Sequence, residues 1–290
     1  MAWDLSERIE RARPSDPHRD YCLWDYEPPQ SRLPGALRTS ALLYQSFAWA
    51  GVSERMIALT DAIRGCLGPF NTVFGVKWAG GRMSWEFYVY DYARQERRVS
   101  LKTFSEALKP HLRLPACLPD QQPYFMFSIE VDEAVLAAGK LDLIDIYIGI
   151  PGATVSAGMC YGVTDEAVEL RNLYHFYDAA RDGEAILHNL YSSIHVPPDV
   201  PPERFLWPEM QGVQTIVVGT KRFNDGLYFS RISVEQLLFG LRRLEFPAPI
   251  VTYLEENRDR FAHYLFDLGY DYLVEGDAVK PIKGSFYGLL

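Results

Sequence analysis

The stretch VQTIVVGTKRFNDGLYFSRIS, residues 213–233, consists of two extended segments joined by a tight turn. β-Branched and aromatic residues dominate both segments, and the Asn-Asp-Gly sequence between them is typical of a turn. This pattern predicts a β-hairpin. Hairpins of the same kind recur along the chain, and their recurrence decides the expected fold.

Five such pairs follow one another without the strand-helix-strand alternation of a parallel sheet. Ten consecutive antiparallel strands are enough to close a barrel, so we expect an α+β fold, an antiparallel ten-stranded β/α barrel with its helices outside. The predicted pairs are Asn71–Trp78 with Met83–Tyr92, Tyr124–Val131 with Leu141–Ile150, Val155–Val163 with Val168–Tyr177, Val213–Phe223 with Leu227–Ile232, and Tyr270–Val274 with Val279–Tyr287.

Helix signals separate several of these hairpins. Ser100 precedes apolar residues at helical spacing, and Ser233 with Gln236 matches a capping box that opens a helix. Two further helices are expected near 39–51 and 53–68, where glycines stop each pattern, and a last one near 250–265.

The chain divides into an irregular N-terminal arm and one barrel domain. Residues 1–35 are rich in proline and charge and predict an arm lying on the surface. The Pro-rich stretch 196–208 is the best candidate for a linker, but hairpins continue on both sides of it. We therefore expect a single domain over residues 36–290.

The charge balance restricts the partners. The 290 residues carry a formal net charge of −9, which argues against nucleic acid and anionic membrane surfaces. No stretch approaches the apolar length of a membrane span. The cysteines, Cys22, Cys66, Cys117 and Cys160, lack C-x-x-C spacing and lie among apolar neighbours, so we expect buried free thiols and a cytoplasmic location.

Several common catalytic motifs are missing from the sequence. It has no G-x-G-x-x-G after a strand, no G-x-x-x-x-G-K-[ST], no H-E-x-x-H and no G-x-S-x-G. The six histidines lie far apart without metal-ligand spacing, so no metal site is predicted.

Strand alternation places an unusual set of side chains on the face that would look into the barrel lumen. Unpaired buried cations are costly, so these lysines and arginines imply either internal carboxylate partners or a bound polyanion such as a diphosphate. A solvated sheet face is the alternative that the pattern leaves open. The predicted lumen residues are Lys77, Ser84, Glu86, Tyr88, Tyr90, Tyr92, Glu130, Asp145, Tyr147, Glu169, Arg171, Leu173, His175, Tyr177, Lys221, Tyr228, Lys283, Ser285 and Tyr287.

Two segments resemble the ABBA-type aromatic and peptide prenyltransferases, whose ten-stranded prenyltransferase (PT) barrel is built from αββα units. Residues 213–233 look like that family's strand pair ending in N-L-Y-F-S-x-L-S. VKPIKGSFY, residues 279–287, is similar to its last strand, where a lysine and a tyrosine four residues later both point at the diphosphate. Lys283 and Tyr287 have this spacing, and Arg171 with His175 repeats it.

The resemblance extends over residues 36–290, and MSWEF at 83–87 is similar to the family's first-hairpin pattern. The chain also departs from the pattern at two places. Hairpins two and three join through Pro151-Gly152 without intervening helices, and Pro281 interrupts the last strand. These departures bear on the ring of helices and on the catalytic assignment.

The resemblance implies transfer of a prenyl group from an allylic diphosphate to an electron-rich aromatic or peptide side-chain acceptor. Cations would neutralise the leaving diphosphate, tyrosine faces would shield the allylic cation, and a carboxylate would take the proton of the acceptor. We assign the diphosphate contacts to Lys77, Arg171, Lys221 and Lys283, the tyrosine shield to Tyr88, Tyr90, Tyr147, Tyr228 and Tyr287, and the base to Glu86, with Glu130 and Asp145 as reserves.

A structural ion pair is the competing interpretation for each of these carboxylates. No cofactor is required by this mechanism, and the need for magnesium stays open. We expect a monomer. The alternative function is a non-catalytic barrel that binds a small anionic or apolar ligand or a protein partner, with Tyr21, Trp24 and Tyr26 of the arm covering the barrel mouth or forming the contact.

Overall fold

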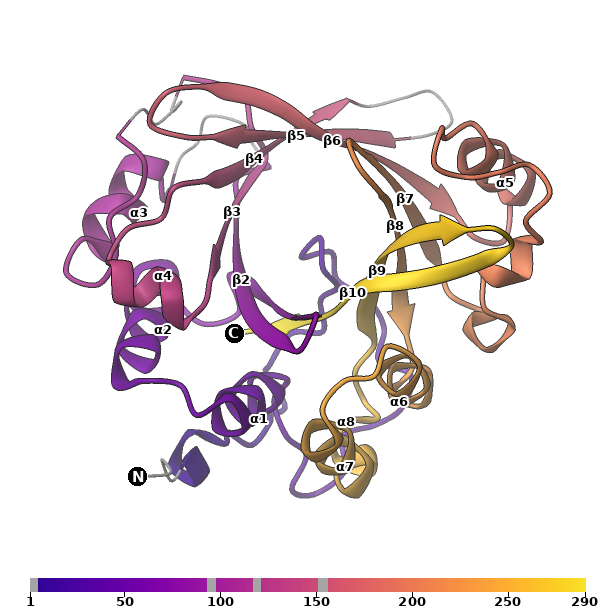
Figure 1. Cartoon of the computed structure of the whole chain (residues 1–290). Helices are drawn as coiled ribbons and strands as arrows, with labels where there is room; N and C mark the ends of the chain where they lie inside the picture. Colours follow the sequence, from indigo (N-terminus) through magenta and orange to yellow (C-terminus); the bar gives the residue numbers. More distant parts are fainter. Residues whose placement is uncertain (1–4, 93–97, 117–120, 151–155) are drawn as a thin grey trace.

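The strands close into a single barrel, which confirms the predicted fold class. The computed structural model describes residues 5–92, 98–116, 121–150 and 156–290. Every strand is antiparallel to its neighbours in sequence, and β1 closes the ring against β10 (Figure 1). The strands are β1 (Thr72–Ala79), β2 (Arg82–Tyr90), β3 (Met126–Val131), β4 (Ile144–Ile150), β5 (Ser156–Val163), β6 (Val168–Asp178), β7 (Thr215–Lys221), β8 (Asp225–Ile232), β9 (Phe266–Glu275) and β10 (Ala278–Leu289).

The helices lie outside the ring of strands (Figure 1). Side-chain caps and glycine stops explain most of them: Ser233 and Gln236 form a capping box at the start of α6, and Gly51 ends α1 in the left-handed conformation. In the described residues the helices are α1 (Ser40–Ala50), α2 (Glu54–Leu67), α3 (Leu101–Leu108), α4 (Glu133–Ala138), α5 (Gly183–Tyr191), α6 (Val234–Arg243), α7 (Ala248–Glu256) and α8 (Arg258–Phe261).

The largest differences between the expected and the observed elements concern two short helices, one divided helix and the start of one strand. The short helices α4 and α5 escape the sequence pattern because each has only one or two buried apolar residues. The helix predicted near 250–265 is divided at Asn257 into α7 and α8. Strand β9 then begins at Phe266, four residues before the predicted start.

The main hydrophobic core lies between the outer face of the barrel and the helices. Phe47 of α1 packs edge-on against Trp85 of β2, and both side chains are fully buried. The Trp85 indole N–H donates to Ser46 Oγ over 2.8 Å, which satisfies its buried polar atom. Because apolar residues take the outer face, the alternating polar residues of the same strands face the lumen.

Three strands contain an extra residue that interrupts the alternation. Arg171 of β6, Arg231 of β8 and Ile282 of β10 have no opposite partner where the strand register shifts. Each is a β-bulge, which turns the side chains beyond it to the other face. Strand β10 continues through Pro281. Proline lacks a backbone N–H, and it is accommodated here beside a bulge, where the regular strand pairing is interrupted.

The N-terminal arm crosses one end of the barrel instead of lying on the surface throughout (Figure 1). Asp16 and Asp20 of the arm are buried, and Asp20 pairs with Arg231 at 2.9 Å. The Tyr21 N–H donates to Asp267 of β9 over 2.9 Å. The prediction of a surface arm is therefore wrong for the segment from Asp16 to Cys22.

The Pro-rich stretch 196–208 packs against the barrel, since Val200, Phe205 and Trp207 of this stretch are buried in the main core. The predicted Pro151-Gly152 junction, Val155 and Cys117 lie outside the described residues. Within the described part of the chain, no helix combines the length and the apolar character needed to cross a membrane.

Candidate functional site

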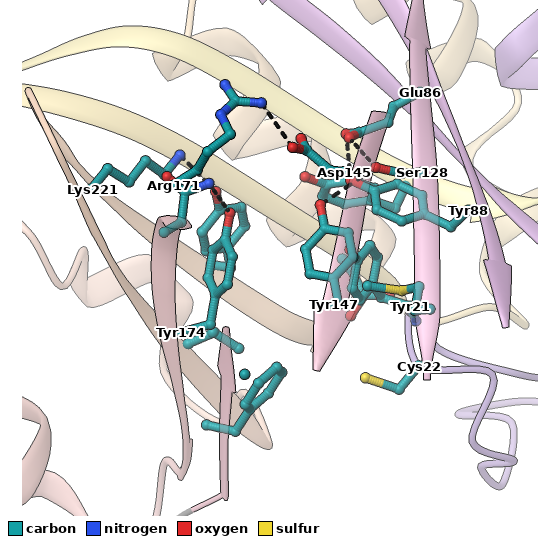
Figure 2. A pocket seen from close by; sticks show the side chains of 18 of the residues that line it. Tyr21, Cys22, Glu86, Tyr88, Ser128, Asp145, Tyr147, Arg171, Tyr174 and Lys221 are labelled. Atoms are coloured by element: carbon teal, nitrogen blue, oxygen red, sulfur yellow. Dashed lines mark hydrogen bonds and ion pairs between the residues drawn. The ribbon is translucent and has the colours of Figure 1, made fainter. Parts of the chain in front are cut away.

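A cavity of about 1040 Å³ occupies the lumen. Residues at both ends of β7, Thr215 and Lys221, line it, so it extends along the barrel. All of the predicted site residues except Tyr90 line this cavity. Figure 2 shows Glu86, Asp145, Arg171 and Lys221 in the upper part of the view, with Tyr21 and Cys22 of the arm below them on the right.

Lys77 of β1 lies between two carboxylates near one rim. Its ammonium group is 2.6 Å from Glu86 of β2 and 2.8 Å from Glu130 of β3. We call these three residues the acidic triad, because one cation faces two carboxylates. Burial opposes the charge on Lys77, but Glu130 and Glu86 outweigh it and raise the pKa of the lysine.

Glu86 has further donors. Ser128 Oγ of β3 donates to one carboxylate oxygen over 2.9 Å, and the Tyr88 hydroxyl donates to the other. The Glu86 side chain is buried, and Lys77 together with these two hydroxyl groups satisfies its carboxylate oxygens. Glu130 is less enclosed, with a side chain 48% exposed towards the rim.

A second group of charges, on β7, β9 and β10, has two cations for one carboxylate, the reverse of the acidic triad. The Asp271 carboxylate of β9 forms ion pairs with two ammonium groups, that of Lys221 of β7 at 2.5 Å and that of Lys283 of β10 at 2.7 Å. We call these three residues the basic triad, since two cations share one carboxylate. Burial opposes ionisation of Asp271, but the two ammonium groups prevail and hold its pKa well below the usual range.

The two lysines of the basic triad differ in their surroundings. Burial, together with the charge of Lys283, lowers the pKa of Lys221 to about 8 even though Asp271 opposes the shift. The Lys221 ammonium also lies 3.1 Å from the Tyr228 hydroxyl. Lys283 is more open, with its side chain 28% exposed. The lumen therefore has its excess positive charge at β7, β9 and β10.

Arg171 pairs with Asp145 across the remaining sector. The guanidinium donates to the carboxylate over 2.8 Å (Figure 2). Burial raises the pKa of Asp145, and Arg171 opposes this shift only in part. The sequence predicts either internal carboxylate partners for the lumen cations or a bound polyanion. Each of the four predicted cations has an internal carboxylate partner.

A belt of tyrosines lines the middle of the lumen. Neighbouring rings around it have centroids 6.0 to 6.4 Å apart. Every second strand contributes one ring, as in the layered interiors of closed barrels. The tyrosine belt consists of Tyr287 of β10, Tyr88 of β2, Tyr147 of β4, Tyr174 of β6 and Tyr228 of β8.

Glycines on the strands between make room for these rings. A Cβ added at Gly75 of β1 would lie 2.9 Å from Cε1 of Tyr287, and one added at Gly269 of β9 would overlap the Tyr228 ring. Only a residue without a side chain fits beneath the rings at these positions. The positions of the rings therefore depend on sequence features in adjacent strands.

Tyr90 lies on the lumen face, as predicted, but below the cavity: its half-buried ring packs against the lumen cluster and stacks on Tyr92, and its hydroxyl donates to the Tyr21 carbonyl. One strand-face prediction differs from the structure. On β6 the bulge at Arg171 reverses the alternation, so Tyr174 lines the lumen while Leu173 and His175 do not. Tyr174, and not His175, is therefore the lumen partner of Arg171 on this strand.

Sequence reasoning missed several lumen residues: Ser128, Tyr174, Asp267 and Asp271. The signal for the two aspartates was present, because Asp267, Gly269 and Asp271 alternate with large apolar residues. Starting the predicted strand at Tyr270 hid that alternation. The sequence predicts that the arm aromatics Tyr21, Trp24 and Tyr26 cover the barrel mouth or contact a partner; Tyr21 and Trp24 line the cavity, and Tyr26 does not.

No cluster of three or more metal-ligating side chains occurs within the described ranges. The cysteines described there, Cys22, Cys66 and Cys160, are free thiols, and only Cys160 is fully buried. Comparison of the sequence with models of protein families and with curated proteins finds no match. The fold and the lumen geometry are therefore the basis for assigning a class of function.

Proposed function

We propose that this protein transfers a prenyl group from an allylic diphosphate to an electron-rich aromatic or peptide side-chain acceptor. The observation that carries the proposal is the separation of charge in the lumen. The basic triad has one excess positive charge, the acidic triad has one excess negative charge, and the tyrosine belt lies below both. These are the three environments that the reaction needs.

The diphosphate belongs at the basic triad. Heterolysis of the allylic C–O bond leaves its electron pair on the diphosphate oxygen, so negative charge grows there in the transition state. Lys283 is the more exposed lysine and is able to approach the ligand while Asp271 retains Lys221. A preorganised ammonium group at this point lowers the barrier because it is already oriented in the unreacted state.

The tyrosine belt suits the allylic cation. Aromatic faces attract a cation and contain no strongly nucleophilic atom, so they delay capture by water. Each tyrosine of the belt has a raised pKa, first because of burial, and its hydroxyl therefore stays protonated near neutral pH. The acceptor then forms the new C–C or C–heteroatom bond to the allylic carbon.

The proton released by the acceptor goes to the acidic triad. Glu86 is our first choice of base because it lies deepest, next to Tyr88 of the belt. Glu130 is the alternative, since its exposed side chain meets an acceptor entering from the rim. Asp145 is the third candidate, although Arg171 already holds one of its oxygens.

Intact-mass measurement tests the proposal. The protein is incubated with dimethylallyl or geranyl diphosphate and a set of phenols, indoles and tyrosine- or tryptophan-containing peptides, with and without magnesium. We expect one acceptor to gain the mass of a single prenyl group. The matched control is the Lys280→Ala variant, which removes a cation from the same strand but outside the lumen, where it pairs with Glu275.

A second function is favoured by a specific observation. The four predicted lumen cations pair with four carboxylates, so these ion pairs together carry no net charge. A barrel that carries a neutral or singly charged amphiphile fits this balance. Ligand-induced stabilisation without any acceptor of increased mass would favour this function over transfer.

A further inference from the structure

Three side chains contact the Glu86 carboxylate, and they are divided unequally between its two oxygens. Oε2 pairs with the Lys77 ammonium group at 2.6 Å and also accepts from the Tyr88 hydroxyl. Oε1 accepts from the neutral Ser128 hydroxyl of β3 over 2.9 Å. Because an ammonium group repels a proton, Oε1 is the oxygen better placed to receive one.

A chain of hydrogen bonds leads to this oxygen from the tyrosine belt. Ser128 Oγ also lies 3.4 Å from the Tyr147 hydroxyl of β4. Serine has a single hydroxyl hydrogen and donates it to Glu86, so Tyr147 is the donor in this second contact. The chain therefore runs from Tyr147 to Ser128 and from Ser128 to Glu86 (Figure 2).

Tyr147 is the end of the chain that an acceptor is able to reach. Its ring lies in the belt between Tyr88 and Tyr174, at centroid distances of 6.4 and 6.2 Å, and it lines the cavity. The Glu86 side chain is only 4% exposed, and Ser128 only 1%. Burial raises the pKa of the Tyr147 phenol, so its hydroxyl gives up a proton only as another arrives.

We propose that Tyr147 and Ser128 form a relay that carries the proton of the acceptor to Oε1 of Glu86; this inference rests on the proposed function. The proton leaves the N–H or O–H bond of the acceptor for the Tyr147 oxygen, and the electron pair of that bond stays with the acceptor. The Tyr147 proton passes to Ser128 Oγ, and the Ser128 proton passes to Oε1. Both hydroxyl groups are thereby restored, and Glu86 becomes neutral.

The two members have different roles in this relay. Tyr147 meets the acceptor and is a catalytic residue, whereas Ser128 is a positioning residue that links it to Glu86. The 3.4 Å contact between the two hydroxyl groups is long for a hydrogen bond. Catalytic hydrogen bonds are often long without substrate and shorten in the complex.

Kinetics of the Tyr147→Phe and Ser128→Ala variants test the relay. Each should lower kcat about a hundredfold and change KM little, because general acid–base catalysis acts on the reacting proton. Since either substitution interrupts the same chain, the double variant should be no slower than the slower single variant. Ser128→Thr keeps the hydroxyl and should recover most of the rate. Tyr161→Phe, at a tyrosine packed against the main core outside the lumen, is the matched control.

An NMR measurement without substrate accompanies the kinetics. The ζ-carbon signal of Tyr147, identified by its absence from Tyr147→Phe, reports the hydrogen bond of its hydroxyl. It should move in Ser128→Ala, return in Ser128→Thr and stay in place in Tyr161→Phe. An unmoved signal in Ser128→Ala, additive losses in the double variant or full turnover by Tyr147→Phe would reject the relay alone. No transfer by the wild type would reject the proposed function and the relay with it.

Discussion

Lys283 is the more exposed of the two lysines of the basic triad. It shares Asp271 with the more buried Lys221, so the carboxylate remains paired when Lys283 is removed. The side chains of Lys283 and Tyr287 occupy one face of β10, with a single residue of the same face, Ser285, between them. A ligand that contacts the lysine is thus adjacent to the ring of the tyrosine.

We expect Lys283→Ala to lower prenyl transfer by about two orders of magnitude, as the loss of a preorganised electrostatic contact typically does. The fold should persist because Lys221 continues to neutralise Asp271. Turnover measured by intact mass, together with a melting curve, checks both expectations. Normal turnover, or a variant that unfolds, would show that Lys283 is a structural charge.

We expect Tyr287→Phe to cost less activity than Tyr287→Ala. Phenylalanine keeps the ring over Gly75 and the contact with Tyr21, and loses only the hydroxyl that lies 2.9 Å from Ser285. Alanine opens the belt and admits water to the site of the allylic cation. Equal losses in the two variants would indicate that the hydroxyl, and not the ring, matters.

At the scale of the residue, alternation predicted most of the lumen but not its pairing. Lys77, Glu86 and Glu130 lie on three different strands, and only the register of the closed barrel brings them within 3 Å. The sequence identifies each of these residues as facing the lumen, but it does not show which of them form ion pairs with one another. Asp271 shows the same limit, because its role depends on two lysines from β7 and β10.

At the scale of the element, the bulges explain where the alternation fails. An extra residue at Arg171 turns Tyr174 into the lumen, and an extra residue at Arg231, with φ near 60°, accompanies its contact with Asp20. Bulges of this kind re-aim one side chain and reverse the faces beyond it. The residues at these bulges share no residue type that would predict them. The faces that alternation assigns to a strand are therefore correct only as far as its first bulge.

The glycines beneath the belt give a prediction for strand β9. Gly269→Ala should destabilise the protein by about 1 to 3 kcal/mol, because a Cβ there overlaps the Tyr228 ring and forces it out of place. Chemical denaturation measures the loss. Gly183→Ala, at the start of α5 where a Cβ meets nothing within 4 Å, is the control and should be neutral or slightly stabilising.

A wild-type stability for Gly269→Ala would contradict the arrangement of the belt. In that case the Tyr228 ring would have to occupy another position, away from β9. The proposed shield for the allylic cation would then lose one of its members.

At the scale of the whole molecule, the ten-strand barrel followed from the hairpin rhythm, whereas the sequence left the position of the arm aromatics open, over the barrel mouth or in contact with a partner. The arm is rich in proline and charge, as a surface segment is, and yet it buries Asp16 and Asp20 and places Tyr21 in the lumen. The contacts of Tyr21 with Asp267 and of Asp20 with Arg231 join residues more than 200 positions apart. The composition of the arm therefore does not predict these contacts with the barrel.

The junction of the arm and the barrel predicts a dependence of stability on pH. Burial, followed by the charge of Asp20, raises the pKa of Asp267 to about 7 from its ordinary value near 3.8. The folded state therefore keeps a proton between these values that the unfolded state has released. The resulting stabilisation is full below about pH 4 and is lost as the pH rises towards 7.

Asp267→Asn should abolish this dependence, since the amide resembles the protonated acid at every pH. Between pH 5 and pH 8 the wild type should lose on the order of a few kcal/mol relative to the variant, as measured by urea unfolding. Asp142→Asn, at an exposed carboxylate with a side chain 86% exposed, should behave like the wild type. Parallel pH profiles for wild type and Asp267→Asn would show that Asp267 is already ionised in the folded protein.

The central claim is that the basic triad holds the diphosphate of an allylic substrate, and thermal unfolding with a non-reactive ligand tests it most directly. A thiolo-diphosphate analogue and inorganic diphosphate should each raise the melting temperature by a few degrees, roughly the effect of a ligand bound only to the folded state. The shift should be much smaller in Lys283→Ala and unchanged in Lys280→Ala. No shift of the wild type at millimolar ligand, with or without magnesium, would contradict the claim.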